Sequence, residues 1–182
     1  MVKRPDSGYV LIVLMMAVLV LAVGLTVAVP VLETELRREK EEELIFRGRQ
    51  YVEAVRLFQT NNPGRFPASL KELFDNGYLR KPFTDPMTAS GEWDVILDPA
   101  GQLESRGGGG TRQVLVVPLS ALETVQNPVV LGVVSSSTKT SIRLYEEQGS
   151  YDKWLFFYGH DPRNPPKIVY PGRAEEAPGE GA

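Results

Sequence analysis

The chain of 182 residues has no cysteine and a single histidine, His160. The absence of cysteine excludes disulfides, thiolate metal ligands and cysteine nucleophiles. One histidine excludes any metal site that needs several imidazoles. The chain also lacks an excess of positive charge, because its formal net charge is −3 and its basic and acidic residues are interleaved. We therefore expect no nucleic-acid partner.

Motifs of enzyme chemistry are also missing. The glycine run Gly107–Gly110 is not followed by a Lys-Ser or Lys-Thr pair at a helix start, so it is not a phosphate-binding loop. No serine, carboxylate pair or glycine elbow near His160 would give that histidine a catalytic role. We expect no enzyme activity.

One long apolar run dominates the first part of the chain. From Tyr9 to Val29 there is no charged residue. A helix of this length reaches about 30 Å, the thickness of a bilayer's hydrocarbon core. The run is longer than the roughly 7–15 apolar residues of a secretory signal. The sequence therefore predicts a retained single-pass anchor. Lys3 and Arg4 in the preceding head favour a cytoplasmic N-terminus, with the remaining chain on the far side of the membrane.

The helix is expected to continue beyond the anchor. Pro30 lacks an amide N–H and is predicted to kink it. The stretch from Leu32 to Gln59 is rich in good helix formers. Within it, Glu39–Glu43 reads as a solvated helix face, and an apolar stripe follows at helical spacing: Leu44, Gly48, Tyr51 or Val52, Val55 and Phe58. This second half is therefore amphipathic and able to hold a globular domain.

The remaining chain predicts a small sheet. Asn61–Gly64 ends the long helix, and Ser69 is placed to cap a short helix through Phe74. Strand composition appears in 93–97, 114–119, 129–134, 141–145 and 154–158. The glycine-rich stretch 106–111 predicts a flexible loop, and the chain from Pro171 a disordered tail. The order of these elements predicts an α+β fold, with a long N-terminal helix packed on a small antiparallel sheet.

The N-terminal residues resemble those of a known family, the type IV pilins and type II secretion pseudopilins. The junction Gly8-Tyr9, between a short charged head and the apolar run, resembles the prepilin peptidase site. Pro30 stands where family members interrupt the anchor helix. The segments Phe66–Leu73, Gly77–Leu79 and Asp85-Pro86 resemble the loop after the long helix in the major pseudopilins.

The resemblance implies processing and assembly. Cleavage would follow Gly8, and Tyr9 would become the methylated first residue. The helix would then assemble through its apolar side chains Leu11, Ile12, Val13, Leu14, Leu19 and Leu21. The implied segments are a leader at 1–8, a transmembrane or filament-core helix at 9–30, its amphipathic continuation at 31–60, a periplasmic α+β domain at 61–170 and a disordered tail at 171–182.

One residue departs from the family pattern. Family members usually carry glutamate at the fifth mature position, which is Val13 here. A buried carboxylate there can offset the positive N-terminus of a neighbouring subunit. Valine cannot do so, which puts the role of a major filament subunit in doubt and is compatible with a minor or tip subunit.

The resemblance also suggests a calcium site, because some pseudopilins bind calcium in a loop near the C-terminus. Calcium needs about six to eight converging oxygen ligands. Asp152 and Asp161 are weak candidates, since the sequence around them supplies few such ligands. We therefore predict no cofactor, with calcium as a minor alternative.

The function that follows is that of a structural subunit in a type II secretion pseudopilus or a type IV pilus-like filament. Its expected partners are other pilin-like subunits, the prepilin peptidase, an inner-membrane assembly platform and membrane lipid. The alternative is a single-pass, membrane-anchored periplasmic binding or adaptor module that does not polymerise. Both interpretations place the protein in a bacterial inner membrane, with its domain in the periplasm.

Overall fold

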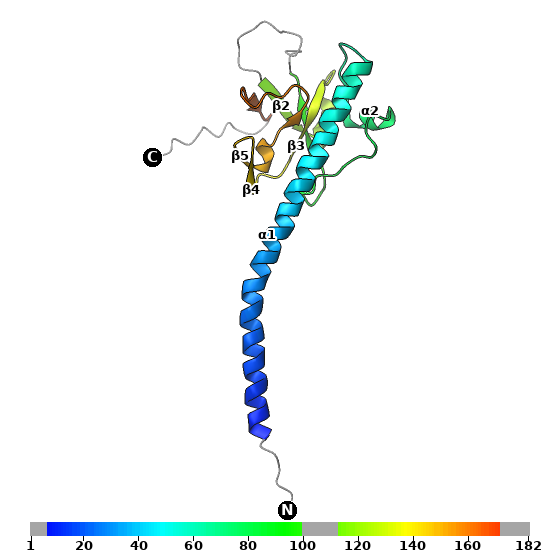
Figure 1. Ribbon diagram of the computed structural model, residues 1–182. Helices are drawn as coiled ribbons and strands as arrows, with labels where there is room; N and C mark the ends of the chain where they lie inside the picture. Colours follow the sequence, from blue (N-terminus) through cyan, green and yellow to red (C-terminus); the bar gives the residue numbers. More distant parts are fainter. Residues whose placement is uncertain (1–6, 100–112, 172–182) are drawn as a thin grey trace, which may run out of the picture. The chain divides into compact units, whose positions relative to one another are not determined.

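A computed structural model describes residues 7–99 and 113–171 (Figure 1). The predicted glycine-rich loop and the predicted tail beyond Pro171 lie outside these residues. The chain divides into two compact units, the first ending at Glu39 and the second beginning at Lys40. The long helix α1, Ser7–Asn61, belongs in part to each unit.

In the first unit, the beginning of α1 is apolar and exposed on every side. All described side chains from Tyr9 to Gly24 are exposed. The large apolar ones among them range from 48% exposed at Val13 to 71% at Tyr9. Farther along, charged side chains follow, with Arg38 and Glu35 forming an ion pair of 3.8 Å. This part of the helix therefore buries no apolar side chain within the described residues.

The membrane-spanning prediction is corrected by this structure. Across residues 7–99 and 113–171, no helix is long and apolar enough to cross a membrane. The predicted membrane-spanning half of the helix and the predicted single-pass inner-membrane location are therefore wrong. The alternative function as a membrane-anchored module depended on the same span and is not retained.

The second unit contains a five-stranded sheet in the order β6-β3-β1-β2-β7 and a separate hairpin of β4 and β5. The strands are β1 Trp93–Leu97, β2 Gln113–Pro118, β3 Val130–Ser135, β4 Thr140–Tyr145, β5 Gln148–Ser150, β6 Phe156–Phe157 and β7 Lys167–Val169. Two 3₁₀ helices, η1 Leu119–Thr124 and η2 Tyr151–Lys153, complete the described elements.

The sheet is mixed rather than antiparallel. β1 pairs antiparallel with β2 and β3, and β3 pairs antiparallel with β6. β7 pairs parallel with β2. After β6 at one edge, the chain crosses to the opposite edge before β7, and such a crossover allows a parallel strand. The prediction of a purely antiparallel sheet is therefore wrong at this edge.

Both faces of the sheet are buried. One face packs with the stripe of α1, where Leu44, Val55 and Phe58 join a core that includes Trp93 and Val133. The opposite face forms a second cluster of buried residues: Ile96, Val114, Val116, Leu131, Val134, Leu155 and Phe157. Alternation along β1 therefore sends apolar side chains into both clusters, and the strand is buried on both sides.

The short helix α2, Leu70–Asp75, begins as its sequence predicts. The Ser69 Oγ accepts the amide N–H of Glu72 at 3.1 Å. In return, the Glu72 carboxylate accepts the N–H of Ala68 at 2.7 Å. The pair is similar to a capping box, except that the Glu72 carboxylate accepts the N–H of the residue before the N-cap rather than that of Ser69 itself.

Two glycines allow elements to approach more closely than any side chain would permit. A Cβ on Gly48 of α1 would lie 2.3 Å from the Phe156 ring. A Cβ on Gly132 of β3 would lie 1.9 Å from the carbonyl oxygen of Phe156. Phe156 therefore touches the backbone of α1 with its ring and that of β3 with its main chain.

We predict that Gly48→Ala lowers the free energy of unfolding. Alanine favours a helix by about 1 kcal/mol over glycine, but overpacking a core costs about 1–3 kcal/mol, and here the ring must move. Urea denaturation measures the net effect. Gly24→Ala is the control on the same helix, because no heavy atom lies within 4 Å of the added Cβ. Equal stability of the two variants would contradict the close contact.

Candidate functional site

The first candidate site is the apolar segment of α1, Tyr9 to Gly24. The predicted assembly residues Leu11, Ile12, Val13, Leu14, Leu19 and Leu21 all lie in it and are all exposed. Because successive residues of a helix are rotated by about 100°, such a run presents apolar surface on every side. Exposing so large an apolar surface to water is unfavourable. The segment is thus an apolar surface that no other described residue covers.

The predicted processing and kink residues also lie in α1. Gly8 and Tyr9 fall in its first helical turn. The helix continues through Pro30, so this proline does not end it. Cleavage after Gly8 and a bend at Pro30 stay predictions.

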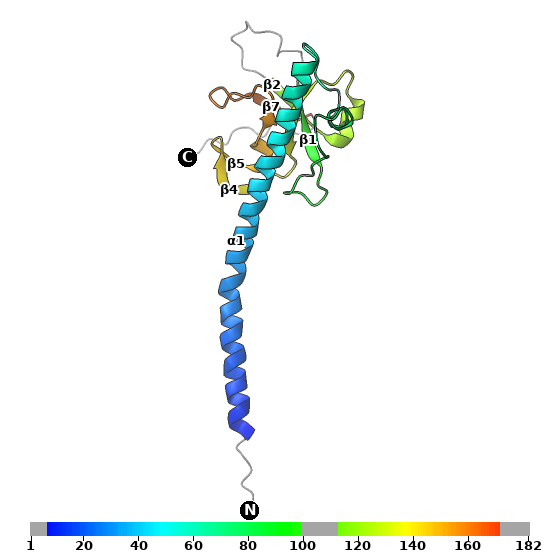
Figure 2. The same cartoon turned by 45° about the vertical axis from the view of Figure 1, so that its right-hand side comes forward.

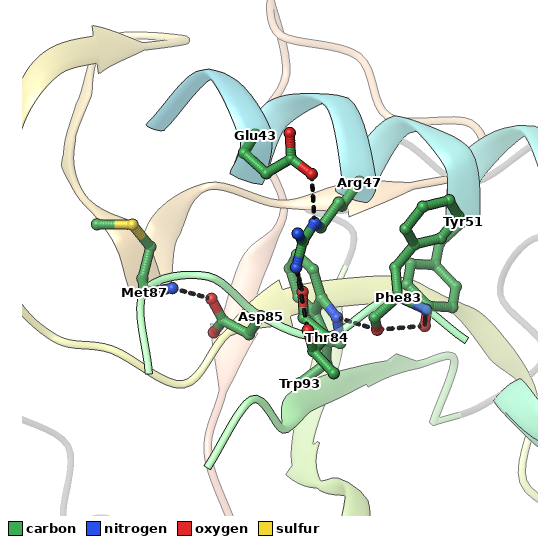
Figure 3. Close-up of polar contacts among 8 residues, drawn as sticks. All are labelled: Glu43, Arg47, Tyr51, Phe83, Thr84, Asp85, Met87 and Trp93. Carbon is green, nitrogen blue, oxygen red and sulfur yellow. Dashed lines mark hydrogen bonds and ion pairs between the residues drawn. The ribbon is translucent and has the colours of Figure 1, made fainter. Parts of the chain in front are cut away.

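A second candidate is the loop before β1, which is fixed on α1 through polar contacts (Figure 3). The Arg47 guanidinium donates to the carbonyl oxygen of Thr84 at 2.7 Å and to its hydroxyl at 3.0 Å. The same side chain pairs with Glu43, one turn earlier in α1, at 2.7 Å. The carboxylate orients the guanidinium, and the guanidinium holds the loop backbone.

Two aromatic side chains hold the neighbouring residue, Phe83. The Tyr51 hydroxyl donates to the carbonyl oxygen of Phe83 at 2.8 Å and accepts its N–H at 3.2 Å. The indole N–H of Trp93 donates to the same carbonyl at 2.9 Å. Burial raises the pKa of Tyr51 to about 12, so the hydroxyl keeps the proton it donates. The backbone of this loop is therefore satisfied by side chains of α1 and β1.

Asp85 is a buried carboxylate in the same loop (Figure 3). Its oxygens accept the hydroxyl of Ser135 at 2.7 Å and the N–H of Met87 at 2.8 Å. Burial raises the pKa of Asp85 above its ordinary value, and these hydrogen bonds oppose that rise. Ser135 is itself fully buried, so the Asp85–Ser135 pair has no access to a substrate. The pair ties the loop to the end of β3.

Another buried carboxylate, Glu41, holds the β4–β5 hairpin. Glu41 is fully buried, although the sequence placed it on a solvated face. Its carboxylate accepts the N–H of Ile142 at 2.7 Å, the N–H of Arg143 at 3.2 Å and the hydroxyl of Tyr151 at 2.7 Å. That solvated-face prediction is wrong for this residue. Glu41 lies three residues before Leu44, at the edge of the buried stripe, and this spacing is the one hint of its burial in the sequence, whereas the donors that it accepts come from distant parts of the chain.

The weak metal candidates do not come together. Asp161 accepts the N–H of Arg163, and the carbonyl oxygen of Asp152 accepts the hydroxyl of Tyr170. Among the residues that the structure describes, no group of three or more His, Cys, Asp or Glu side chains is arranged to hold a metal ion. The Nε2 of His160 lies 2.5 Å from a carboxylate oxygen of Glu146, and the imidazole packs against the ring of Phe157. Calcium binding stays an untested minor alternative.

We predict that Glu41→Gln destabilises the second unit. The amide keeps the shape, but it places N–H donors where other donors converge. Leaving buried donors unsatisfied costs about 1–3 kcal/mol. The control is Glu42→Gln, because Glu42 is exposed and its pairing with Arg143 is a surface ion pair, worth about 0–1 kcal/mol. Urea denaturation of both variants measures the difference, and a loss no larger than that of the control would contradict the role of Glu41.

We predict that Asp85 makes stability depend on pH in a defined direction. Because its pKa is raised in the folded state, that state binds the proton more tightly than the unfolded chain does. The resulting stabilisation is complete at pH values below 3.8, the ordinary pKa of this carboxyl group. It is lost as the pH rises through the folded-state pKa. The free energy of unfolding of the wild type, minus that of Asp85→Asn, should therefore fall as pH rises from 3.8.

Urea denaturation at a series of pH values measures this difference. Asp75→Asn, at an exposed carboxylate of α2, reports the general effect of removing one negative charge. A difference for Asp85 that is flat, or that grows with pH, would contradict the assignment.

The comparisons with known proteins leave the family open. No protein-family model, curated protein or solved structure matches this chain.

Proposed function

We propose that this protein is a structural subunit of a filament of the type IV pilus or type II secretion pseudopilus kind. In this filament the apolar segments of neighbouring copies pack together. Partners are other pilin-like subunits and the peptidase that prepares them. The observation that carries the proposal is the exposure of apolar side chains on every side of α1 from Tyr9 to Gly24.

The all-round exposure favours a bundle of like helices over a groove on another protein. A groove covers one face of a helix and leaves the opposite face in water. In this segment no face is polar, because no charged residue occurs between Tyr9 and Val29. Neighbouring copies placed around each helix would cover all sides, and burial of apolar surface would drive that packing.

The second unit supports the proposal in a different way. Its core is closed on both faces of the sheet, and the loops beside α1 are fixed by Arg47, Tyr51 and Glu41. The apolar segment is therefore not needed to complete that core. It is available for assembly between copies.

Processing would prepare the segment for assembly. Cleavage after Gly8 would remove the charged head and leave Tyr9 as the first residue, in agreement with the resemblance at this junction. The bundled segment would then contain no side-chain charge from the head.

The test is made on protein isolated from its native source. Mass spectrometry should find a chain that begins at methylated Tyr9, and the protein should sediment with fibres. The variant Leu14→Asp should lose sedimentation, because it would bury a charge in the bundle. Leu119→Asp, in the partly exposed η1, is the control and should still sediment. A chain that keeps its first eight residues and never sediments with fibres would overturn the proposal.

A further inference from the structure

The most exposed large apolar side chain of the described residues lies outside the apolar segment. Leu144 of β4 is 75% exposed, more than any such residue of α1. Ile142, two positions earlier, is also exposed. Both lie in a stretch of β4 whose pairing with β5 is irregular, and we call this exposed stretch with the turn that follows it the projection.

The hairpin that carries Leu144 is firmly held. Glu41 fixes the adjacent amides of Ile142 and Arg143. The ring of Tyr145 packs at 5.4 Å on those of Trp154 and Phe156. The exposure of Leu144 therefore belongs to a fixed element, and it is not the result of a loose strand end.

The turn next to Leu144 is acidic. Tyr145 pairs with Gln148, which leaves Glu146 and Glu147 as a two-residue turn. Both have positive φ, 50° and 65°, a backbone conformation that usually takes glycine or asparagine. Glu147 is exposed, whereas the Glu146 carboxylate lies 2.5 Å from the Nε2 of His160. The projection is therefore apolar at Leu144 and negative at its tip.

A complementary surface lies around Phe46 of α1. Phe46 is 53% exposed and packs edge-to-face on Phe83, with ring centroids 6.3 Å apart. The amino group of Lys81 lies 5.2 Å from the centroid of the Phe83 ring. Arg80, next to Lys81, is exposed. This surface is apolar at its centre. Glu42 and Glu43, one turn before Phe46, are each paired with an arginine, and Lys81 and Arg80 add positive charge at its rim.

The hairpin and the loop that carries Phe83 lie on opposite flanks of α1, and Phe46 lies on the solvent-facing side of the helix between them. Glu41 and Glu42 hold the hairpin, whereas Arg47 and Tyr51 hold the loop that carries Phe83. At about 100° per residue, Glu41 and Arg47 lie on either side of the buried stripe, whereas Phe46 lies near Glu42 on the side that faces away from it. Figure 2 agrees, with β4 and β5 on one side of α1 and the chain leading into β1 on the other.

We propose that the β4–β5 projection of one copy docks on the Phe46–Phe83 surface of a second copy. Leu144 would cover the two phenyl rings, and the acidic turn would face Lys81 and Arg80. Because the two surfaces differ, the contact is head-to-tail and can continue from copy to copy. The contact rests on the proposed filament, for which it names a specific lateral contact.

The test uses disulfide cross-linking in assembled full-length protein, since the chain has no cysteine of its own. Copies with Leu144→Cys are mixed with copies with Phe46→Cys and oxidised gently. A mixed dimer should dominate over either homodimer. Pairing Leu144→Cys with Leu119→Cys is the control and should yield little product. A dominant Leu144→Cys homodimer, or equal yields with the control, would overturn the contact.

Charge reversal gives a second readout that does not depend on folding of the core. Glu147→Lys in the Leu144→Cys copies should lower the mixed-dimer yield by about two- to five-fold, the range expected for exposed charge pairs. Lys81→Glu in the Phe46→Cys copies should restore it. Failure of restoration would count against the docking.

The outcomes separate the two proposals. Fibres without the mixed dimer would overturn this contact and leave the filament proposal standing. The mixed dimer in protein that never forms fibres would support the contact and overturn the filament. A cross-link from the Leu144→Cys copies to some other protein would assign the projection to a different partner and overturn the contact between copies.

Discussion

The close contact between α1 and Phe156 sets the position from which the second unit is built. Gly48 lets the helix backbone lie against the Phe156 ring, and Gly132 lets the backbone of β3 approach the main chain of the same residue. Because α1 lies this close to Phe156, the side chains of Arg47 and Tyr51 reach the backbone of the loop before β1. On the other flank, Glu41 reaches the amides of β4. Small changes at Gly48 would therefore affect both the loop and the hairpin.

The same helix meets two different environments along its length. From Leu44 onward its apolar stripe is buried in the core of the second unit. From Tyr9 to Gly24 they are exposed on all sides. Stability of the folded unit and the proposed association between copies thus involve different stretches of one helix. A substitution in either stretch can alter one property and leave the other nearly intact.

The sequence predicted elements whose signals are local. The Ser69 cap, the strand at Trp93–Leu97 and the end of α1 near Asn61 each follow from a few neighbouring residues. The strands β5 and β7 have only three residues each, too few to show the alternation of apolar and polar residues that predicts a strand. Burial of Glu41 was also missed, because its partner Ile142 lies 101 positions later in the chain. A carboxylate is buried only where distant donors converge on it, and no local pattern shows that convergence.

The parallel pairing of β7 with β2 has a consequence for the timing of folding. β2 borders β1, which comes shortly before it in the chain, but its other edge is covered only by Lys167–Val169. During synthesis, that edge must wait until nearly all of the described chain has left the ribosome. Pairings between such distant segments form slowly, and an open strand edge invites wrong partners in the meantime. Nascent chains of this protein should therefore depend on chaperones more than the helical part alone would suggest.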